Sequence, residues 1–332
     1  MDPVSQAVLG ASAAQSGANA RQMRVAAVVG ILGGMAPDLD VLIRSPLDPL
    51  LFLEYHRHFT HALLFIPVGS FLVAAFCHAL FARRHLGFRQ TWLYAALGYA
   101  THGVLDACTT YGTQLLWPFS DARIAWNLVS VIDPLFTLPV LLGVVFAMLR
   151  RSRRAAVLAL AWSVAYPMLG LVQRERAEAV GLEQALARGH APIRLEAKPS
   201  FANILLWKVV YETEDRFHVD TVRAGISLRF YPGESVPVLD VAAQFPWLSP
   251  DSQQARDLER FRWFSNGYIA PHPRDPLQVI DMRYSMVPNE IEPLWTIRLD
   301  PGAGREAHVE YLASRDTGGE RLQRFREMLL GR

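Results

Sequence analysis

Cysteine is scarce in this sequence, and so is charge over most of its first half. Only two of the 332 residues are cysteines, Cys77 and Cys108, and both lie inside apolar segments. We expect them towards opposite ends of neighbouring helices, too far apart for a disulfide, with each thiol packed as a small apolar side chain. A disulfide-stabilised scaffold is therefore not expected.

The sequence also lacks the features of a nucleic-acid-binding protein and of a protein with a cleaved leader. Its formal net charge is +2, and it has no basic stripe interleaved with aromatic residues. Residues Met1-Asp2-Pro3 provide no basic region, and Ser, Gly and Asn interrupt the apolar stretch that follows. We therefore expect no nucleic-acid partner and no cleavable signal peptide.

What the first half does contain is long apolar runs. Apolar residues make up 51% of the chain and charged residues 19%. Residues 25–36 are apolar but shorter than the roughly 20 residues of a spanning helix, which predicts a short helix or a re-entrant segment ending at Pro37. Four other stretches are nearly uncharged and long enough to cross a bilayer: residues 61–82, 91–108, 128–149 and 155–173. We expect about four long membrane helices plus short N-terminal helices.

Arginines in three short connections predict how this domain lies in the membrane. One group precedes residues 25–36, a second separates the first two long stretches, and a third separates the last two. Short loops rich in arginine are normally cytoplasmic, and a single threading puts all three groups on that side. The groups are Arg21 and Arg24; Arg83, Arg84 and Arg89; and Arg150, Arg151, Arg153 and Arg154. This predicts a multi-pass inner (cytoplasmic) membrane protein.

After residue 173 the sequence has the charge density of a soluble domain. Residues 174–188 have the pattern of a charged amphipathic helix. Short runs rich in β-branched and aromatic residues follow, separated by Gly, Pro and Asp turn signals. The runs are Ile204–Thr213, Phe217–Phe230, Val236–Val241, Leu277–Tyr284 and Leu294–Leu299. The prediction is a helical transmembrane domain (1–175), an amphipathic helix and linker (176–192) and a soluble, mostly antiparallel α+β domain (193–332).

Seven residues with coordinating side chains fall where the apolar stretches end, on the side opposite the arginines. Carboxylate and imidazole groups are costly near hydrocarbon and usually face a bundle interior or a polar cavity. Imidazole suits zinc and other transition metals, and carboxylates also accept harder ions such as manganese. We therefore predict a divalent metal, zinc or manganese, on the non-cytoplasmic side. The candidate ligands are Asp38, Asp40, His56, His61, His102, Asp106 and Asp133.

The spacing of these residues supports a shared site, although each motif has an alternative. His102 and Asp106, at i and i+4 in an apolar helix, lie on one face, but they can also form a buried hydrogen-bonded pair. Asp38 and Asp40 follow a proline stop and can point at one cation, or they can belong to a solvated turn. Asp133 precedes Pro134 and suits a helix N-cap equally well.

Three histidines in six residues, His56, His58 and His61, lead directly into an apolar stretch. His58 and His61 lie at i and i+3 and can face together if the helix has begun, whereas an interfacial stretch without metal is the alternative. Further along, residues 109–121 combine hydroxyl and amide groups with Trp117 and Phe119. This loop can line the mouth of a substrate site or simply anchor the chain at the membrane interface.

At these residues the first 150 positions resemble the YdjM-like family of inner-membrane proteins, which are described as metal-dependent hydrolases, some of them LexA-regulated. The resemblance rests on Pro-Asp-Leu-Asp at 37–40, the His-Arg and Thr-His pairs within 56–61, His102 with Asp106, and the run from Tyr111 to Phe119. It implies a hydrolase with these ligands: Asp38, Asp40, His56, His61, His102 and Asp106. The chain departs from the family at Ser5-Gln6, where members often have a histidine, and at His58, where glycine is common.

The leading functional hypothesis is a membrane-embedded hydrolase that acts on an ester or phosphoester through a metal-activated water. Its candidate catalytic residues are His56, as ligand or general base, Arg57, which can stabilise negative charge on a phosphate-like oxygen, and His58. A site at the membrane face favours a lipid or lipid-linked substrate. The alternatives are a non-catalytic metal-binding, sensing or transport protein, and an anchor for the C-terminal domain. The sequence does not predict the oligomeric state.

Overall fold

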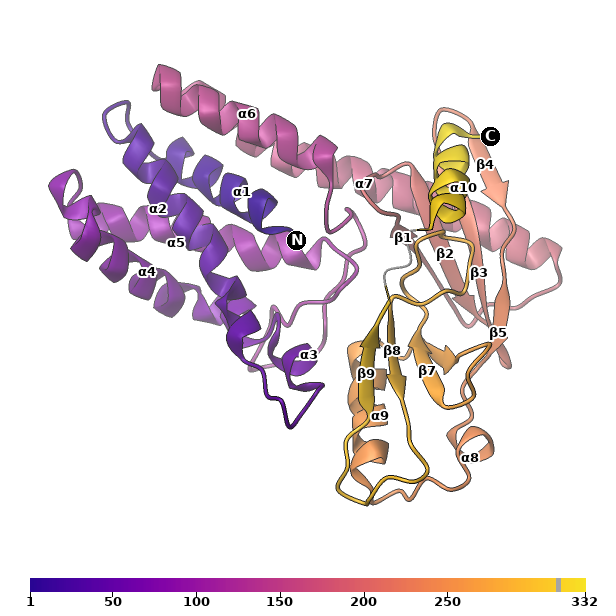
Figure 1. Ribbon diagram of the computed structural model, residues 1–332. Coiled ribbons are helices and arrows are strands. Elements are labelled where there is room, and N and C mark those ends of the chain that lie inside the picture. Colours follow the sequence, from indigo (N-terminus) through magenta and orange to yellow (C-terminus); the bar gives the residue numbers. More distant parts are fainter. Residues whose placement is uncertain (315–317) are drawn as a thin grey trace. The chain divides into compact units, whose positions relative to one another are not determined.

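Helices form the regular structure of the first half of the computed structural model, which describes residues 1–314 and 318–332 (Figure 1). The α-helices are α1 (Pro3–Ser16), α2 (Met23–Met35), α3 (Leu51–Tyr55), α4 (Ile66–Leu80), α5 (Phe88–Ala107), α6 (Pro134–Arg150) and α7 (Arg153–Ala187). Short 3₁₀ turns join them: η1 (Ala36–Leu42), η2 (Phe59–His61), η3 (Leu63–Phe65) and η4 (Ala82–Arg84).

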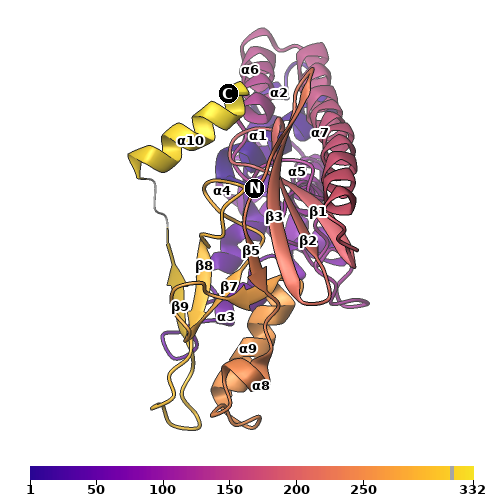
Figure 2. The ribbon, with the colours of Figure 1, turned by 90° about the vertical axis from the view of Figure 1, so that its right-hand side faces the viewer.

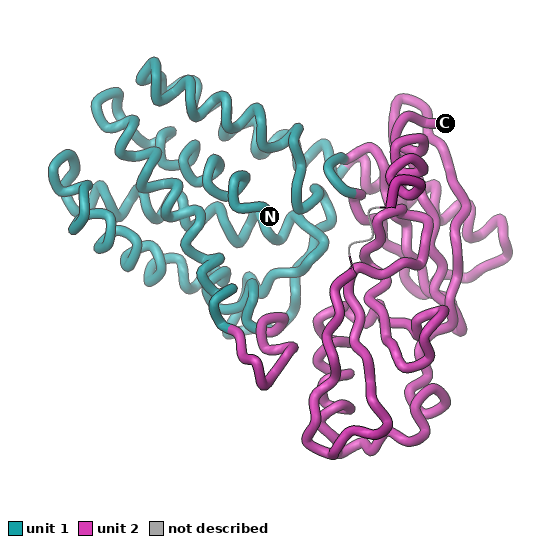
Figure 3. The backbone as a smooth tube through the Cα atoms, viewed as in Figure 1, with its two compact units in different colours: residues 1–43, 55–171, 201–203 teal, residues 44–54, 172–200, 204–332 magenta. Residues whose placement is uncertain are grey.

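The chain divides into two units, shown in Figure 3. Unit 1 comprises residues 1–43, 55–171 and 201–203, and unit 2 comprises residues 44–54, 172–200 and 204–332. The helical first half followed by a sheet-containing second half confirms the predicted fold class. Helix α7 runs without a break through the residues predicted as a separate amphipathic helix, so a single helix enters both units.

Unit 1 is built from three helical hairpins whose connections carry the arginines. Helices α1 and α2, α4 and α5, and α6 and α7 are consecutive pairs, and the three arginine groups lie at or beside their connections. Helix α5 packs against α1, α2 and α4. The α2–α5 contact is close because of glycine: a Cβ on Gly98 would lie 2.4 Å from the Gly30 carbonyl oxygen. This close contact brings the end of α2 next to the last turns of α5.

Among the described residues three helical segments are long and apolar enough to span a membrane, namely Met23–Leu42, Leu63–Leu80 and Arg153–Ala187, and α6 is a shorter apolar helix. The first differs from the expected short segment, because η1 continues α2 past Pro37. Helix α5 forms as predicted but is not one of these candidates. Its buried face carries polar side chains such as Thr91, His102 and Asp106, which the surrounding helices shield.

Unit 2 contains two antiparallel sheets. The first has the order β1 (Arg194–Pro199), β2 (Leu206–Glu212), β3 (Arg216–Ala224), β4 (Leu228–Tyr231), with β5 (Ser235–Pro237) also paired to β3. The second has the order β6 (Ile269–Pro271), β7 (Gln278–Asp281), β8 (Trp295–Arg298), β9 (Glu310–Ala313). The remaining helices are α8 (Val241–Gln244), α9 (Gln253–Phe264) and α10 (Gly319–Leu330).

The last turns of α7 cover the first sheet of unit 2 (Figure 2). The Glu178 carboxylate accepts a hydrogen bond from the Ala197 amide of β1 at 3.0 Å, and Gly181 lies directly against Val209 of β2. The run predicted as one strand from Phe217 to Phe230 is the β3–β4 hairpin, since its turn signal lies inside the run. Strands β1, β6 and β9 were not predicted because they are short or rich in charge.

Candidate metal centre

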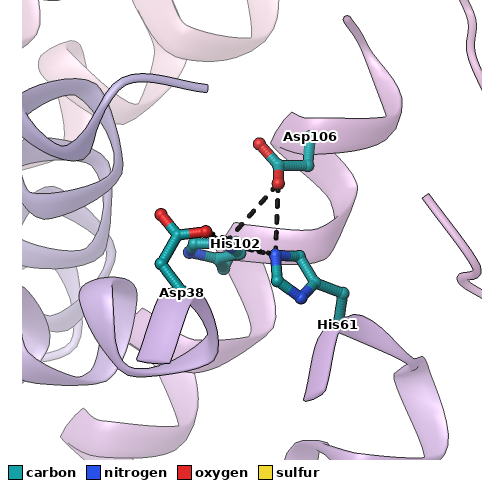
Figure 4. Close-up of side chains that lie close together, drawn as sticks. All are labelled: Asp38, His61, His102 and Asp106. Atoms are coloured by element: carbon teal, nitrogen blue, oxygen red, sulfur yellow. Dashed lines mark hydrogen bonds and ion pairs between the residues drawn. The ribbon is translucent and has the colours of Figure 1, made fainter. Parts of the chain in front are cut away.

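Four side chains from three segments of unit 1 converge on one point (Figure 4). Asp38 comes from η1, His61 from η2, and His102 and Asp106 from α5. One ligand atom of each lies within 4.8 Å of those of the other three. His102 and Asp106 meet here because positions i and i+4 of a helix share a face, as the sequence predicts.

The close approach of η2 to α5 depends on Gly103. A Cβ at this position would lie 2.3 Å from the His61 carbonyl oxygen, so only glycine lets the two backbones come this near. Tyr99, one turn earlier, donates a hydrogen bond from its hydroxyl to the Thr60 carbonyl at 2.8 Å. Together these contacts fix His61 beside His102.

Hydrogen bonds orient both imidazole rings towards the same point. His102 Nδ1 contacts the Gly34 carbonyl oxygen at 2.5 Å, and His61 Nδ1 lies 3.2 Å from Asp40 Oδ2. Since a carbonyl or carboxylate oxygen accepts, each Nδ1 carries the proton and each Nε2 presents a lone pair to the centre. Such a bond on the far nitrogen is the usual support of a metal-binding histidine.

The distances between the four ligand atoms fit a tetrahedral ion. Zinc bonds of 2.0–2.1 Å to nitrogen and oxygen place the ligand atoms of a tetrahedron about 3.3 Å apart. The two Nε2 atoms are 2.9 Å apart. Asp38 Oδ1 lies 3.5 Å from His61 Nε2 and 3.3 Å from His102 Nε2. For Asp106 Oδ2 the corresponding distances are 3.2 and 3.6 Å.

The electrostatics of this cluster also favour a cation. When both rings are neutral, their Nε2 lone pairs face each other at 2.9 Å and repel unless a cation, either a proton or a metal ion, lies between them. Asp106 Oδ2 is buried and, among the described residues, accepts no well-oriented hydrogen bond, although it lies 3.0 Å from Arg57 Nε and against both rings. This carboxylate is paired with the Arg57 guanidinium and with the Met1 amino group, so the site for an ion is indicated by the four ligand atoms together. The cluster of Asp38, His61, His102 and Asp106 can therefore hold a metal ion.

Asp40 and His56 form a second group with Asp38. His56 Nδ1 lies 2.8 Å from Asp40 Oδ1, while Asp40 Oδ2 accepts hydrogen bonds at 2.9 Å from both the Arg57 amide and the Thr60 hydroxyl. Asp40 thus has most of its acceptor capacity filled by protein donors. Asp40 is therefore suited to orienting His56 and His61 through contacts with their Nδ1 atoms.

Of the remaining candidates, Arg57 contacts the centre, whereas His58 and Asp133 lie outside both groups. The Arg57 side chain is buried: its Nε lies 3.0 Å from Asp106 Oδ2 and its Nη1 donates to the Thr109 hydroxyl at 2.8 Å. His58 packs among aromatic rings, including Trp117 at 5.3 Å between centroids, and is in neither group of the described residues. Asp133 is likewise in neither group.

Asp133 instead takes the role of a helix cap. Its Oδ1 accepts hydrogen bonds from the Leu135 and Phe136 amides at the start of α6, at 3.1 and 3.3 Å. The Tyr166 hydroxyl donates to both of its oxygens. These contacts correspond to the capping alternative that the sequence left open for this residue.

Sequence reasoning missed the supporting residues of the centre. Gln6, which stands near the family's N-terminal histidine position, is fully buried and donates from Nε2 to Asp106 Oδ1 at 2.9 Å. The amino group of Met1 pairs with the same oxygen. A buried glutamine within a helix of small residues was the available signal, because an amide there needs a partner. Gly34 and Thr60 carried no comparable signal.

An Asp40→Asn variant should bind metal about 10–100-fold more weakly than the wild type, the usual cost of losing an outer carboxylate. The amide keeps one acceptor but presents NH₂ to a ring nitrogen or to the Arg57 amide, so the orientation of His61 is weakened. Isothermal titration with zinc measures the effect, with Asp133→Asn as the matched control. Equal affinity of the Asp40→Asn and control proteins would contradict a supporting role for Asp40.

Comparisons with known proteins agree with this description of unit 1. Residues 1–177 match the family model described as YdjM inner membrane protein. The uncharacterized protein YfhP of Bacillus subtilis is 28% identical over 104 residues, 31% of this chain and 31% of YfhP. Inner membrane protein YbcI of Escherichia coli is 34% identical over 108 residues, 31% of this chain and 60% of YbcI. The chain thus spans less than two thirds of either relative. No solved structure matches.

Proposed function

The chain belongs to the YdjM inner membrane protein family, and from that premise we propose that it is a membrane-embedded, metal-dependent hydrolase of esters or phosphoesters. The observation that carries the proposal is the convergence of two imidazole nitrogens and two carboxylate oxygens at tetrahedral separations. Two nitrogens and two oxygens favour zinc, with manganese as the second choice.

Four protein ligands would fill a tetrahedral ion, so hydrolysis requires that water add as a fifth ligand or take the place of Asp38, the exposed ligand. An ion at this centre would then supply Lewis acidity, lowering the pKa of that water molecule towards neutrality and polarising the bond to be cleaved. The side chain of Asp38 is 24% exposed, whereas those of His61, His102 and Asp106 are fully buried. Water and substrate therefore approach from the side of Asp38. The three buried ligands keep the rest of the centre closed to solvent.

His56 is the best candidate for the general base. Its side chain is 19% exposed, and its Nδ1 is held by Asp40 Oδ1 at 2.8 Å. A carboxylate on one ring nitrogen leaves the other free to accept a proton, which is the arrangement of histidine bases in general. His56 and Asp38 also share a group of ligand atoms within 4.8 Å, so the base lies beside the open side of the centre.

Apolar side chains around this opening support a lipid or lipid-linked substrate. Leu39 and Leu42, in the same 3₁₀ turn η1 as Asp38 and Asp40, are 64% and 72% exposed. The three hairpins place the arginine-bearing connections at one end of the helices, and the positive-inside rule makes that end cytoplasmic. The proposal therefore puts the metal centre and the C-terminal unit on the non-cytoplasmic side of the inner membrane.

The test is hydrolysis by detergent-purified protein reconstituted into liposomes that contain phosphoester or carboxylester lipids. We expect product release that a chelator abolishes and added zinc or manganese restores. His61→Ala should be inactive, while Asp133→Asn should remain active because asparagine also caps helices. Stoichiometric metal without metal-dependent cleavage of either lipid class would instead favour the non-catalytic alternative, a metal-binding, sensing or transport protein.

A further inference from the structure

The chain segment between Asp40 and His56 of the candidate centre belongs to unit 2. Asp40 and His56 lie in unit 1, but residues 44–54 between them group with the C-terminal residues (Figure 3). Leu50 and Leu53 of this segment are 1% and 2% exposed. The segment is therefore packed into unit 2 and is not a free surface loop.

Arg260, in α9, is the main polar contact of this segment. Its two terminal nitrogens bind the two oxygens of Asp48, at 2.8 and 3.0 Å, and its Nε donates to Glu54. Burial raises the pKa of Asp48, but hydrogen bonds from Arg260 outweigh this effect and keep the pKa below its ordinary value. A single guanidinium therefore binds the side chains of residues 48 and 54 at the same time.

Unit 2 holds Arg260 rigidly in turn. Asp257, whose side chain is fully buried, accepts from Arg260 Nη1 at 2.8 Å, and its other oxygen accepts from the Val309 amide and contacts His308 Nδ1. The ring of Phe52 packs edge-on against Tyr311 at 5.4 Å. An isolated surface ion pair contributes little, but a bidentate arginine with a buried second carboxylate has a defined geometry.

The segment 44–54 is connected to the centre by the backbone on both of its sides. Three residues separate Asp40 from Arg44, and one residue, Tyr55, separates Glu54 from His56. The base of the loop is closed by the hydrogen bond from the Arg57 amide to Asp40 Oδ2, at 2.9 Å, and by the His56–Asp40 contact. Arg57 has a φ of 66°. This left-handed backbone conformation is uncommon for a residue other than glycine and persists where surrounding contacts stabilise it.

We propose that Arg260 is a positioning residue for the metal centre. By binding Asp48 and Glu54, it fixes the segment 44–54, which lies in the chain between Asp40 and His56. Unit 2 then acts on the centre through this chain segment, and a ligand that shifts α9 would change the affinity for metal. By linkage, metal binding would in turn stabilise α9 in its present position. This inference rests on the proposed metal centre and extends it.

The test compares Arg260→Gln with Arg188→Gln in the full-length protein. Arg188 also binds a carboxylate with two nitrogens, that of the buried Asp220 in β3, so both variants remove a bidentate pair from unit 2. Hydrogen–deuterium exchange of the Arg57 amide and zinc affinity are the readouts. We expect at least tenfold faster exchange and about tenfold weaker zinc binding in Arg260→Gln alone, each relative to the wild type.

Each outcome decides the matter. Exchange and affinity that match those of Arg188→Gln would overturn the role of Arg260. If the wild type binds no zinc, the proposed function fails, and exchange at the Arg57 amide still decides whether Arg260 holds the loop. If Arg260→Gln does not fold, Asp48→Asn removes the same contact from a partly exposed carboxylate and is judged by the same two readouts.

Discussion

We expect stoichiometric metal in the wild-type protein and essentially none in the His102→Ala/Asp106→Ala double variant. These residues supply two of the four ligand atoms from a single face of α5. The two that remain, from Asp38 and His61, cannot enclose an ion that prefers four-fold coordination. Elemental analysis of detergent-purified protein measures the loss directly, and it should be essentially complete.

The control for this experiment must separate loss of ligands from loss of fold. Removing Asp106 leaves the buried guanidinium of Arg57 without its carboxylate, which costs about 3–5 kcal/mol. The single variant His102→Gln keeps that ion pair and should still lose most of the metal, whereas His272→Ala, in the loop after β6, should keep it all. Full metal content in both centre variants would disprove the assignment.

Replacing Gly103 by alanine should disable the centre without touching a ligand. The added Cβ would lie 2.3 Å from the His61 carbonyl oxygen, so the backbone of η2 must move away from α5. Overpacking of this kind costs about 1–3 kcal/mol. A displacement of about 1 Å can lower activity about 100-fold, and we expect a loss of that size in metal-dependent hydrolysis.

The matched control is Gly87→Ala, at the first turn of the same helix, where an added Cβ meets nothing within 4 Å. This variant should retain the zinc affinity and the hydrolytic rate of the wild type, apart from a small change in stability at the helix cap. Thermal unfolding of both variants separates a displaced site from a general loss of fold. Wild-type zinc affinity in Gly103→Ala would contradict the close contact between η2 and α5.

The sequence predicted those parts of the centre that depend on local periodicity. The pairing of His102 with Asp106 follows from one helical turn, and the break at Pro37 brings Asp38 to a helix end. The sequence could not predict whether Asp133 is a metal ligand or a helix cap, because its role depends on Tyr166, 33 residues further along the chain. A sequence pattern identifies residues that can coordinate a metal, but it does not show which of their oxygen or nitrogen atoms already accept or donate hydrogen bonds.

The same limit applies to the fold. Apolar length predicted the helices of unit 1, but it did not reveal that η1 extends α2 into a candidate span or that α5 is shielded by its neighbours. The roles of Asp40 and Gln6 were hidden for a related reason. Their partners come from Arg57 and Asp106, which lie 17 and 100 residues away in the sequence. Contacts of this range are set by packing.

The order in which the chain is synthesised gives the Arg260 contact a further consequence. All four ligand atoms come from residues 38–106, so the complete set has been synthesised before α6 begins. Arg260 follows Asp48 by 212 residues and Glu54 by 206. Under our proposal a nascent chain therefore holds its metal loosely, and firm binding begins only when translation has passed α9. Unfinished chains would release their metal on the non-cytoplasmic side of the membrane.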